Sequence, residues 1–389
     1  MEVLHMATNS AARKSKTQSR ALRYRKGSPK KTFDLQKIVN QKSELQTEIF
    51  ETEFENLVSF DRATTQNLTK KELLVGVIPA YTKEDRLDVA LQSLIDQTVP
   101  LDWILILLNG PEPKNGKLSP AEKQAREFAR KHSNIEVIKL DQAGKVNALN
   151  YSYVYINRKI RELRTQGVDL QVPYALYLDA DVRCEEEMVE HLLEEIDDNP
   201  QAGGVMARYS FEFQEGRKYS AAERSFLYSQ RAEFAMKTVE QQTRRRTEIL
   251  GGQATLFRAE ALAKAAKIGY KNLPWSPNTK VEDAELTRVL QTLGYKTLTS
   301  TKARAWVDAM LNAHSWVKQR EKWQDGHLED LSLEMNIVRD KYRLSEQFAL
   351  GWNLLIRMVF VAVFSTGIIM NKISLDQQAL VLAALPICL

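Results

Sequence analysis

The sequence predicts an α/β protein with a mostly parallel sheet flanked by helices, followed by apolar helices at the C-terminus. Two observations predict the sheet. Continuous apolar runs of five to nine residues, which suit strands buried on both faces, recur between residues 73 and 178. Between them lie stretches with the apolar spacing of amphipathic helices. Strands that alternate with helices in this way favour a parallel sheet with a helical layer on each face.

Length and composition set the broad class of protein. The chain has 389 residues, of which 43% are hydrophobic and 27% charged, enough for a substantial core. This composition excludes a disordered tail protein, a collagen-like chain and a small disulfide scaffold. Only two cysteines occur, Cys184 and Cys388, so we expect no disulfide framework and a reducing compartment.

Positive charge is concentrated at the N-terminus. Residues 1–32 hold nine Lys and Arg against a single acid, Glu2, for a net charge of +8. Because the whole chain carries +5, the remaining residues sum to −3. Without an apolar run, this segment is neither a secretory signal nor a membrane span, and we interpret it as a disordered basic arm. Binding to an anionic membrane surface is the alternative, and we expect no nucleic acid partner.

The next segments lead into the body of the protein. Residues 33–72 form a helical N-terminal extension, since apolar residues between Leu35 and Val58 recur at amphipathic spacing. The α/β body then covers residues 73–312. Its expected strands are LLVGVIPAY at 73–81 and the runs at 103–108, 135–140 and 174–178, with helices at 86–95, from Ser119-Pro120 onward, and at 146–163.

The C-terminal region has a different composition. Residues 313–350 are predicted to form interfacial helices, because two tryptophans and several cations share the stretch from His314 to Trp323. Residues 351–389 form an apolar segment that includes the nineteen residues Trp352–Met370. We interpret it as a membrane-associated helix with Arg357 at the cytoplasmic edge, which places the α/β body in the cytoplasm. A pair of buried core helices is the alternative.

Carboxylates directly follow the strand at 174–178. Asp179-Ala180-Asp181 places two of them at positions i and i+2, where both can reach one ligand from a tight turn. Ligands of open parallel sheets bind at the carboxyl ends of the strands. Two such oxygens can hold a hard divalent ion while substrate phosphates complete its shell. A solvated turn is the alternative explanation.

Three further clusters carry polar or flexible residues. In GKVNALN, at 144–150, Lys145 and a helix N-terminus would face an anion. GGQATLFR, at 251–258, begins with a glycine pair that allows the backbone to pass close to a ligand. In Val281-Glu282-Asp283 the aspartate precedes a helix, where a helix cap is the structural alternative to a catalytic base.

The order and spacing of IPAY, GKVNALN, D-A-D, GGQATLFR, VEDAELTRVLQTLGY and QREKW resemble the inverting family 2 glycosyltransferases. The similarity covers about residues 73–326 and is greatest to the membrane-associated branch of cellulose, chitin and hyaluronan synthases. It implies a GT-A, Rossmann-like fold. It also implies roles for individual residues. The nucleotide-sugar would contact Pro79, Tyr81, Asn109, Lys145, Asp179, Gln319 and Arg320; Asp181 and Asp179 would hold the metal; Asp283, paired with Glu282, would be the catalytic base; and Gly252, Gln253 and Trp323 would contact the acceptor.

The resemblance implies a metal-dependent inverting transferase. Mn²⁺ or Mg²⁺ would be the cofactor, a UDP-sugar the expected donor, and a carbohydrate, lipid or protein hydroxyl the acceptor. The family usually has an aspartate where this chain has Asn109, and an arginine in place of Lys322. One apolar span favours transfer of one or a few sugars over export of a polysaccharide. The alternatives are an inactive relative acting as a membrane scaffold or binding protein, and a sugar-phosphate nucleotidyltransferase.

Overall fold

The computed structural model describes residues 72–333 except 112, 114–116, 141 and 166–169, together with scattered helical positions between 348 and 366. The predicted basic arm, nearly all of the N-terminal extension and most of the apolar segment 351–389 lie outside the described residues. The chain divides into two compact units, Met1–Glu329 and Asp330–Leu389. The first unit contains the sheet and the helices that surround it.

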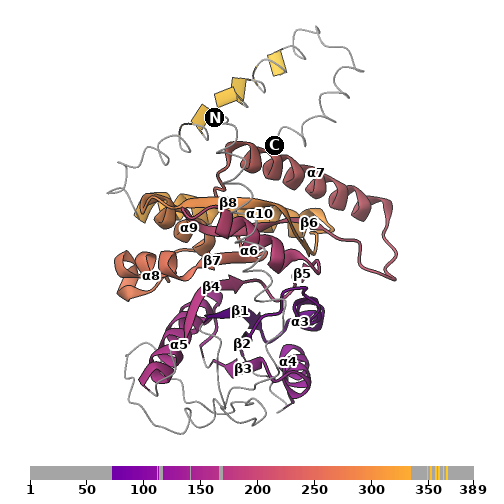
Figure 1. The fold of residues 1–389 in the computed structure, drawn as a ribbon. Coiled ribbons are helices and arrows are strands. Elements are labelled where there is room, and N and C mark those ends of the chain that lie inside the picture. Colours follow the sequence, from indigo (N-terminus) through magenta and orange to yellow (C-terminus); the bar gives the residue numbers. More distant parts are fainter. Residues whose placement is uncertain are drawn as a thin grey trace, which may run out of the picture. The chain divides into compact units, whose positions relative to one another are not determined.

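Eight strands form one sheet in the order β3-β2-β1-β4-β7-β6-β8-β5 (Figure 1). Continuous apolar sequence produces the predicted strands because their side chains are buried on both faces: all seven residues of β2 are buried. The strands are β1 (Glu72–Tyr81), β2 (Trp103–Asn109), β3 (Ile135–Lys139), β4 (Gln171–Tyr177), β5 (Arg183–Cys184), β6 (Ala202–Phe211), β7 (Thr255–Arg258) and β8 (Lys296–Val307).

The helices agree with the sequence where the sequence predicts them. Ser119 caps α4 by accepting a hydrogen bond from the Glu122 N–H at 3.2 Å, and a proline follows it. The described helices are α3 (Leu87–Ile95), α4 (Pro120–Lys131), α5 (Lys145–Thr165), α6 (Met188–Asp198), α7 (Ala221–Arg244), α8 (Ala259–Ile268), α9 (Glu282–Thr292) and α10 (Ala313–Leu333), with a short 3₁₀ turn, η1, at Tyr270–Asn272.

The expectation of a mostly parallel sheet is right in part: four of the seven strand pairs among the described residues are parallel, including β6 with β8, and three are antiparallel. β3, β2, β1 and β4 are all parallel, as predicted. β7 runs antiparallel to both β4 and β6, and β5 is antiparallel to β8, so the sheet is mixed. The four-residue sequence of β7 contains no information on the direction of the strand.

Two cores cover the two faces of the sheet. Along β1, Leu74 and Ile78 pack with α3, α4 and α6, whereas Val75 and Val77 pack with α5, α8 and α9. In Figure 1, α3 and α4 accordingly lie on the opposite side of the sheet from α5. This packing fixes the carboxyl ends of β1, β2 and β4 at one edge. The predicted functional residues follow these strand ends.

Candidate active site

Strand ends and one glycine loop form the first part of the site. Tyr81 and Asn109 are in register at the ends of β1 and β2. The Asn109 amide donates to the Ala80 carbonyl at 3.1 Å, and its Oδ1 accepts from the Gly144 N–H at 3.2 Å. Asn109 is buried, so its side chain connects two strand ends to the loop that precedes α5.

Lys145, the first residue of α5, is surrounded by carboxylates. Its Nζ lies 2.8 Å from Asp179 Oδ1, 3.0 Å from Glu282 Oε1 and 3.8 Å from Asp283 Oδ2. Burial lowers the pKa of Lys145, but the three negative charges outweigh that effect, and its pKa lies well above the ordinary value. Three motifs that are far apart in the sequence therefore meet at one ammonium group.

The glycine pair lies against these carboxylates. The Asp179 N–H donates to the Gly252 carbonyl at 2.6 Å, and the Gly252 N–H donates to Asp283 Oδ2 at 3.2 Å. A Cβ at Gly252 would lie 2.4 Å from Asp179 Oδ2. The close backbone approach expected of this motif is thus observed, and the group approached is the Asp179 carboxylate.

Asp283 lies in the first turn of α9 and does not cap it. The N-cap position is Val281, and no side chain caps the helix there. The cap alternative for Asp283 is therefore wrong. Burial raises the pKa of Asp283 to about 7; Lys145 opposes this increase, whereas the neighbouring acids add to it. A carboxyl that titrates near neutrality is suited to accept a proton in catalysis.

Asp181 lies in an acidic environment that the sequence did not reveal. Burial, followed by the charges of Asp179, Glu84 and Asp308, raises the pKa of Asp181 to about 6. Asp308 directly follows β8, and Arg86 forms an ion pair with it. Had β8 been predicted, a carboxylate at its end would have been the signal for Asp308. Within the described ranges, no group of three acidic, His or Cys side chains could hold a metal by itself.

Most of the predicted residues line one cavity of about 570 Å³. Its lining includes two aromatic residues that the sequence did not predict, Tyr209 and Phe234. The Phe234 ring centroid lies 5.1 Å from that of Tyr209 and 6.4 Å from that of the predicted Trp323. These rings come from β6, α7 and α10. The predicted site residues that line the cavity are Lys145, Asp179, Asp181, Gln253, Glu282, Asp283, Gln319 and Trp323.

The other predicted residues lie elsewhere. Pro79 and Gly252 line a narrow adjoining crevice of about 10 Å³, and Tyr81 is 44% exposed at the end of β1. Arg320 does not line the cavity. Its guanidinium forms an ion pair with Glu233 of α7 at 2.6 Å and stacks over Trp323, 4.6 Å from the ring centroid. In this conformation Arg320 supports the tryptophan.

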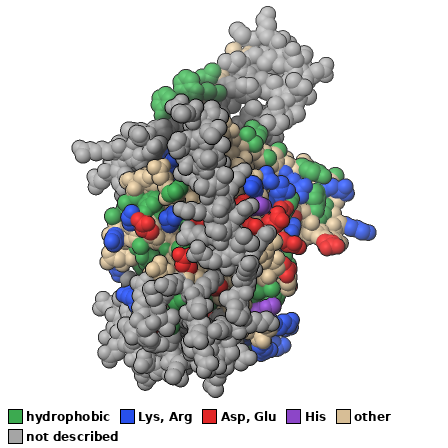
Figure 2. All heavy atoms as spheres, in the orientation of Figure 1, with side chains coloured by type: hydrophobic (Ala, Val, Ile, Leu, Met, Phe, Trp, Pro, Cys, Tyr) green, Lys and Arg blue, Asp and Glu red, His purple; other side chains and the backbone are tan. Residues whose placement is uncertain are grey.

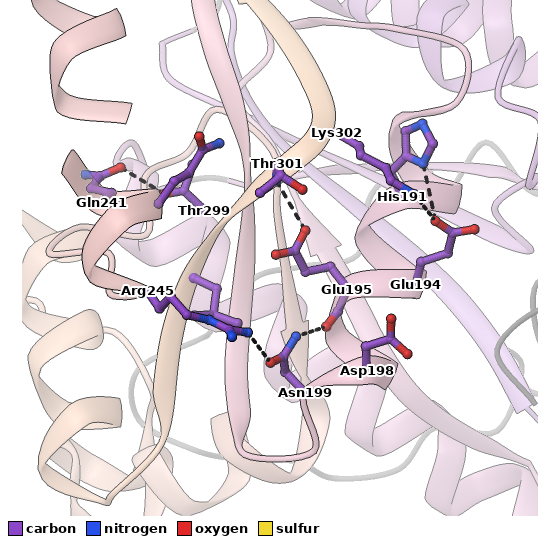
Figure 3. A pocket seen from close by; sticks show the side chains of 12 residues that line it. His191, Glu194, Glu195, Asp198, Asn199, Gln241, Arg245, Thr299, Thr301 and Lys302 are labelled. Carbon is purple, nitrogen blue, oxygen red and sulfur yellow. Dashed lines mark hydrogen bonds and ion pairs between the residues drawn. The ribbon is translucent and has the colours of Figure 1, made fainter. Parts of the chain in front are cut away.

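A second cavity, of about 400 Å³, lies among α6, the end of α7 and β8 (Figure 3). Gln241 lines both cavities, and its Oε1 accepts from the Thr299 hydroxyl at 2.8 Å. Arg245 lines the second cavity but not the first, and it donates a hydrogen bond to Asn199 Oδ1 at 3.3 Å. Adjacent arginines at the end of α7, Arg244 and Arg245, therefore line different cavities.

No helix in the described part of the chain is both long enough and apolar enough to cross a lipid bilayer. Only scattered helical positions of the predicted span at 352–370 are among the described residues.

Several solved structures are similar to the chain. A mannosyltransferase from Pyrobaculum calidifontis, in complex with GDP-Man and Mn²⁺, is 15% identical over 70% of this chain and 66% of its own, with a TM-score of 0.48. GalNAc-T7 with UDP, GalNAc and Mn²⁺ is 14% identical over 61% of this chain and 43% of its own, with a TM-score of 0.41. S. aureus TarS (1–349) with UDP-GlcNAc is 16% identical over 67% of this chain and 66% of its own, with a TM-score of 0.40. The chain spans less than two thirds of the length of each of these three proteins.

The sequence itself matches two protein families. The description "Glycosyl transferase family 2" matches residues 77–265, and "Glycosyl transferase family group 2" matches residues 174–389, more than half of the chain. No curated protein sequence matches the chain. The matched residues include Asp179, Asp181, Gly252 and Asp283, which the structure brings to one edge of the sheet. The chain belongs to glycosyl transferase family group 2.

Proposed function

We propose that the protein transfers a sugar from a nucleotide-sugar, with UDP as the expected nucleotide, to an acceptor hydroxyl with inversion at the anomeric carbon. The observation that carries this proposal is the cluster of Lys145, Asp179, Glu282 and Asp283 in the lining of one cavity. It combines a cation suited to a diphosphate with a carboxylate suited to proton abstraction. Both are needed for one displacement at a sugar carbon.

In the proposed reaction, the acceptor hydroxyl oxygen forms a bond to the anomeric carbon and loses its proton to Asp283. The bond from that carbon to the diphosphate oxygen breaks, and the nucleoside diphosphate leaves with the electron pair. Lys145, at the N-terminus of α5, would bind the diphosphate and offset its growing charge. A single displacement of this kind inverts the configuration, and it needs no separate nucleophile.

The residues present fit a divalent metal ion. Burial raises the pKa of Asp181, the charges of three acids add to the increase, and a cation would relieve the repulsion among these carboxylates. Carboxylate oxygens are the preferred ligands of Mg²⁺ and Mn²⁺, and donor phosphates commonly supply the rest of the shell. Asp181 and Asp179 would hold the ion. When bound, the ion would neutralise charge on the leaving diphosphate.

We also propose that residues 351–389 attach the protein to a membrane, with the catalytic body on the cytoplasmic side. The apolar composition of Trp352–Met370 and the basic residues 1–32 support this proposal. Extraction of the membrane fraction distinguishes the outcomes: we expect release of the protein by detergent. Release by a salt wash alone would contradict the membrane span.

The decisive experiment compares the purified chain with its Asp283→Asn variant on a panel of sugar nucleotides with Mn²⁺ or Mg²⁺. We expect the variant to lose transfer and donor hydrolysis but to keep donor binding, because an amide cannot accept the proton. Asp88→Asn, the same chemical change at an exposed position of α3, is the matched control. Near-normal turnover by Asp283→Asn would refute the base, and a product with retained configuration would refute inversion.

A further inference from the structure

Charge is segregated along the cavity lining. The lining acids Asp179, Asp181, Glu282, Asp283 and Asp308 belong to the catalytic motifs or the end of β8, with Lys145 among them. The stretch of chain from 237 to 248 contributes a different set. It brings Lys237, Arg244 and Arg246 against Glu240 and Glu248, and the cavity gains two more cations from Lys280 and Lys322. Outside the catalytic cluster, five lining cations therefore face two carboxylates.

The cations on α7 are accessible and form only exchangeable pairs. The Lys237 side chain is 50% exposed, and its Nζ lies 3.0 Å from Glu233 Oε1. The Arg244 side chain is 62% exposed and lies 2.8 Å from Glu240 and 3.7 Å from Glu248. Ion pairs this exposed contribute little to stability, so an anionic ligand can replace them at small cost.

An aromatic residue connects this basic stretch to the catalytic end. Lys237 Nζ lies 4.9 Å from the centroid of the Phe234 ring, and Phe234 in turn contacts Trp323. Thr238 and Gln241 add neutral hydrogen-bonding groups to the same wall of α7. Along α7, Lys237 thus lies beside the aromatic residues, and the polar residues Thr238 and Gln241 lie between it and Arg244. This sequence of groups suits a sugar or alkyl portion that ends in an anion.

We propose that the acceptor carries an anionic group, a phosphate or a carboxylate, which binds to Lys237 and Arg244 while its reacting hydroxyl lies at Asp283. This inference rests on the proposed function. The donor diphosphate does not account for these cations, because Lys145 and the ion proposed at Asp179 and Asp181 already serve it. The acceptor is the remaining substrate, and the reaction is the displacement described above, with the anionic group unchanged throughout.

The test uses three acceptor probes with the full chain: octyl β-glucoside, octyl β-glucuronide and octyl β-glucoside 6-phosphate. They present a neutral sugar, a carboxylate and a phosphate, so the two charged probes separate the possible sources of the anion. We expect at least one charged probe to have a kcat/KM about tenfold above that of the neutral probe, a preference of about 1.4 kcal/mol. Added salt should reduce the preference.

Variants locate the effect on α7. Lys237→Gln and Arg244→Gln should each raise KM for the preferred charged probe several-fold, with kcat and the neutral probe unchanged. Arg244→Gln should have the larger effect, because it also releases Glu240 and Glu248. Lys237→Arg should retain the preference. Arg245→Gln is the matched control: it removes the same charge from the neighbouring residue, which lines the second cavity (Figure 3).

Two results would overturn the inference: equal use of neutral and charged probes, or the same loss in Arg245→Gln as in Arg244→Gln. Binding of each probe, measured by NMR saturation transfer without donor, provides a readout that does not need turnover. If no sugar nucleotide is hydrolysed or transferred, the proposed function fails, yet selective binding of a charged probe would still support the anion subsite. Donor hydrolysis without selective binding or use of a charged probe would refute the subsite alone.

Discussion

Asp283 provides the most direct link between one residue and the rate of the reaction. Burial raises its pKa to about 7, although Lys145 opposes the shift. A base must be ionised to accept a proton, and the group is protonated below its pKa. We therefore expect kcat/KM to rise with pH through about 7 and to level off above it. A profile that is flat from acidic to mildly alkaline pH would contradict this role, and unfolding measured over the same range is the control.

Gly252 provides a second prediction at the residue scale. A Cβ there would lie 2.4 Å from the Asp179 carboxylate, which Lys145 holds at 2.8 Å. In Gly252→Ala the carboxylate must move, and we expect transfer to fall by roughly a hundredfold, since small displacements in an active site have effects of this size. Gly251→Ala is the control for donor binding, because its Cβ would meet only the end of the Gln253 side chain, a predicted acceptor contact that can rotate away.

Donor binding measured alongside transfer separates misplacement from misfolding. We expect Gly252→Ala to fold normally and to bind the donor more weakly. Equal, small effects of Gly251→Ala and Gly252→Ala would contradict a specific contact between this backbone and Asp179.

At the residue scale, the sequence located groups better than it located their contacts. Residues in motifs, such as Lys145, Asp179 and Asp283, were predicted because each follows a strand or opens a helix. Their convergence on one ammonium depends on tertiary packing, which no local pattern contains. Tyr209 and Phe234 were missed for the same reason, since an aromatic residue in a strand or helix is ordinarily part of the core.

Among the secondary-structure elements, β2, β3 and α5 are joined by a buried polar cluster. Glu136 of β3 is 2% exposed and accepts hydrogen bonds from the hydroxyl of Tyr155 and, at 3.0 Å, from the indole of Trp103. Burial raises the pKa of Glu136, and these donors oppose the rise. The cluster lies on strands and a helix that carry Asn109 and Lys145 at their ends. It should therefore support the site without taking part in it.

Tyr155→Phe tests this support. Removal of the hydroxyl takes away the hydrogen bond that Tyr155 donates to Oε1 of the buried Glu136. We expect the free energy of unfolding to fall by about 1–3 kcal/mol as a result. The kcat of the folded enzyme should not change. Tyr153→Phe, on the same helix at a half-buried position, is the control for urea denaturation. Equal stability of the Tyr155 and Tyr153 variants would contradict the role of the cluster.

Strands were predictable where both faces are apolar and unpredictable where they are not. β1 and β2 read as continuous apolar runs and have the expected bounds within one residue. β8 contains four Thr and Ser residues and three cations among its twelve residues, and β6 begins with an Ala-Gly-Gly sequence, so neither forms the continuous apolar run that identified the other strands. These two strands complete the sheet and position Asp308 and Tyr209, which explains why that part of the site was missed.

For the whole molecule, the formal charge of +5 describes no single region. Residues 1–32 carry +8 and the rest of the chain −3, and the acids that surround Lys145 and Asp181 belong to the negative part. Within the catalytic body, charge is segregated again, with acids at the strand ends and cations along α7. In Figure 2, Lys and Arg side chains accordingly gather around α7, beside Asp and Glu. The proposed functions therefore depend on the charge of these local clusters and not on the net charge of the chain.

This division predicts the effect of removing residues 1–32. The family matches begin at residue 77, so the shortened chain retains every proposed catalytic group, and we expect its kcat/KM with soluble acceptors to be unchanged. Its binding to vesicles that contain anionic lipid should weaken, since each basic residue near such a surface contributes up to about 1 kcal/mol. Binding to neutral vesicles should not change. Lost transfer by a folded shortened chain would show that the basic arm acts in catalysis, and unchanged binding to anionic vesicles would show that it does not contact the membrane.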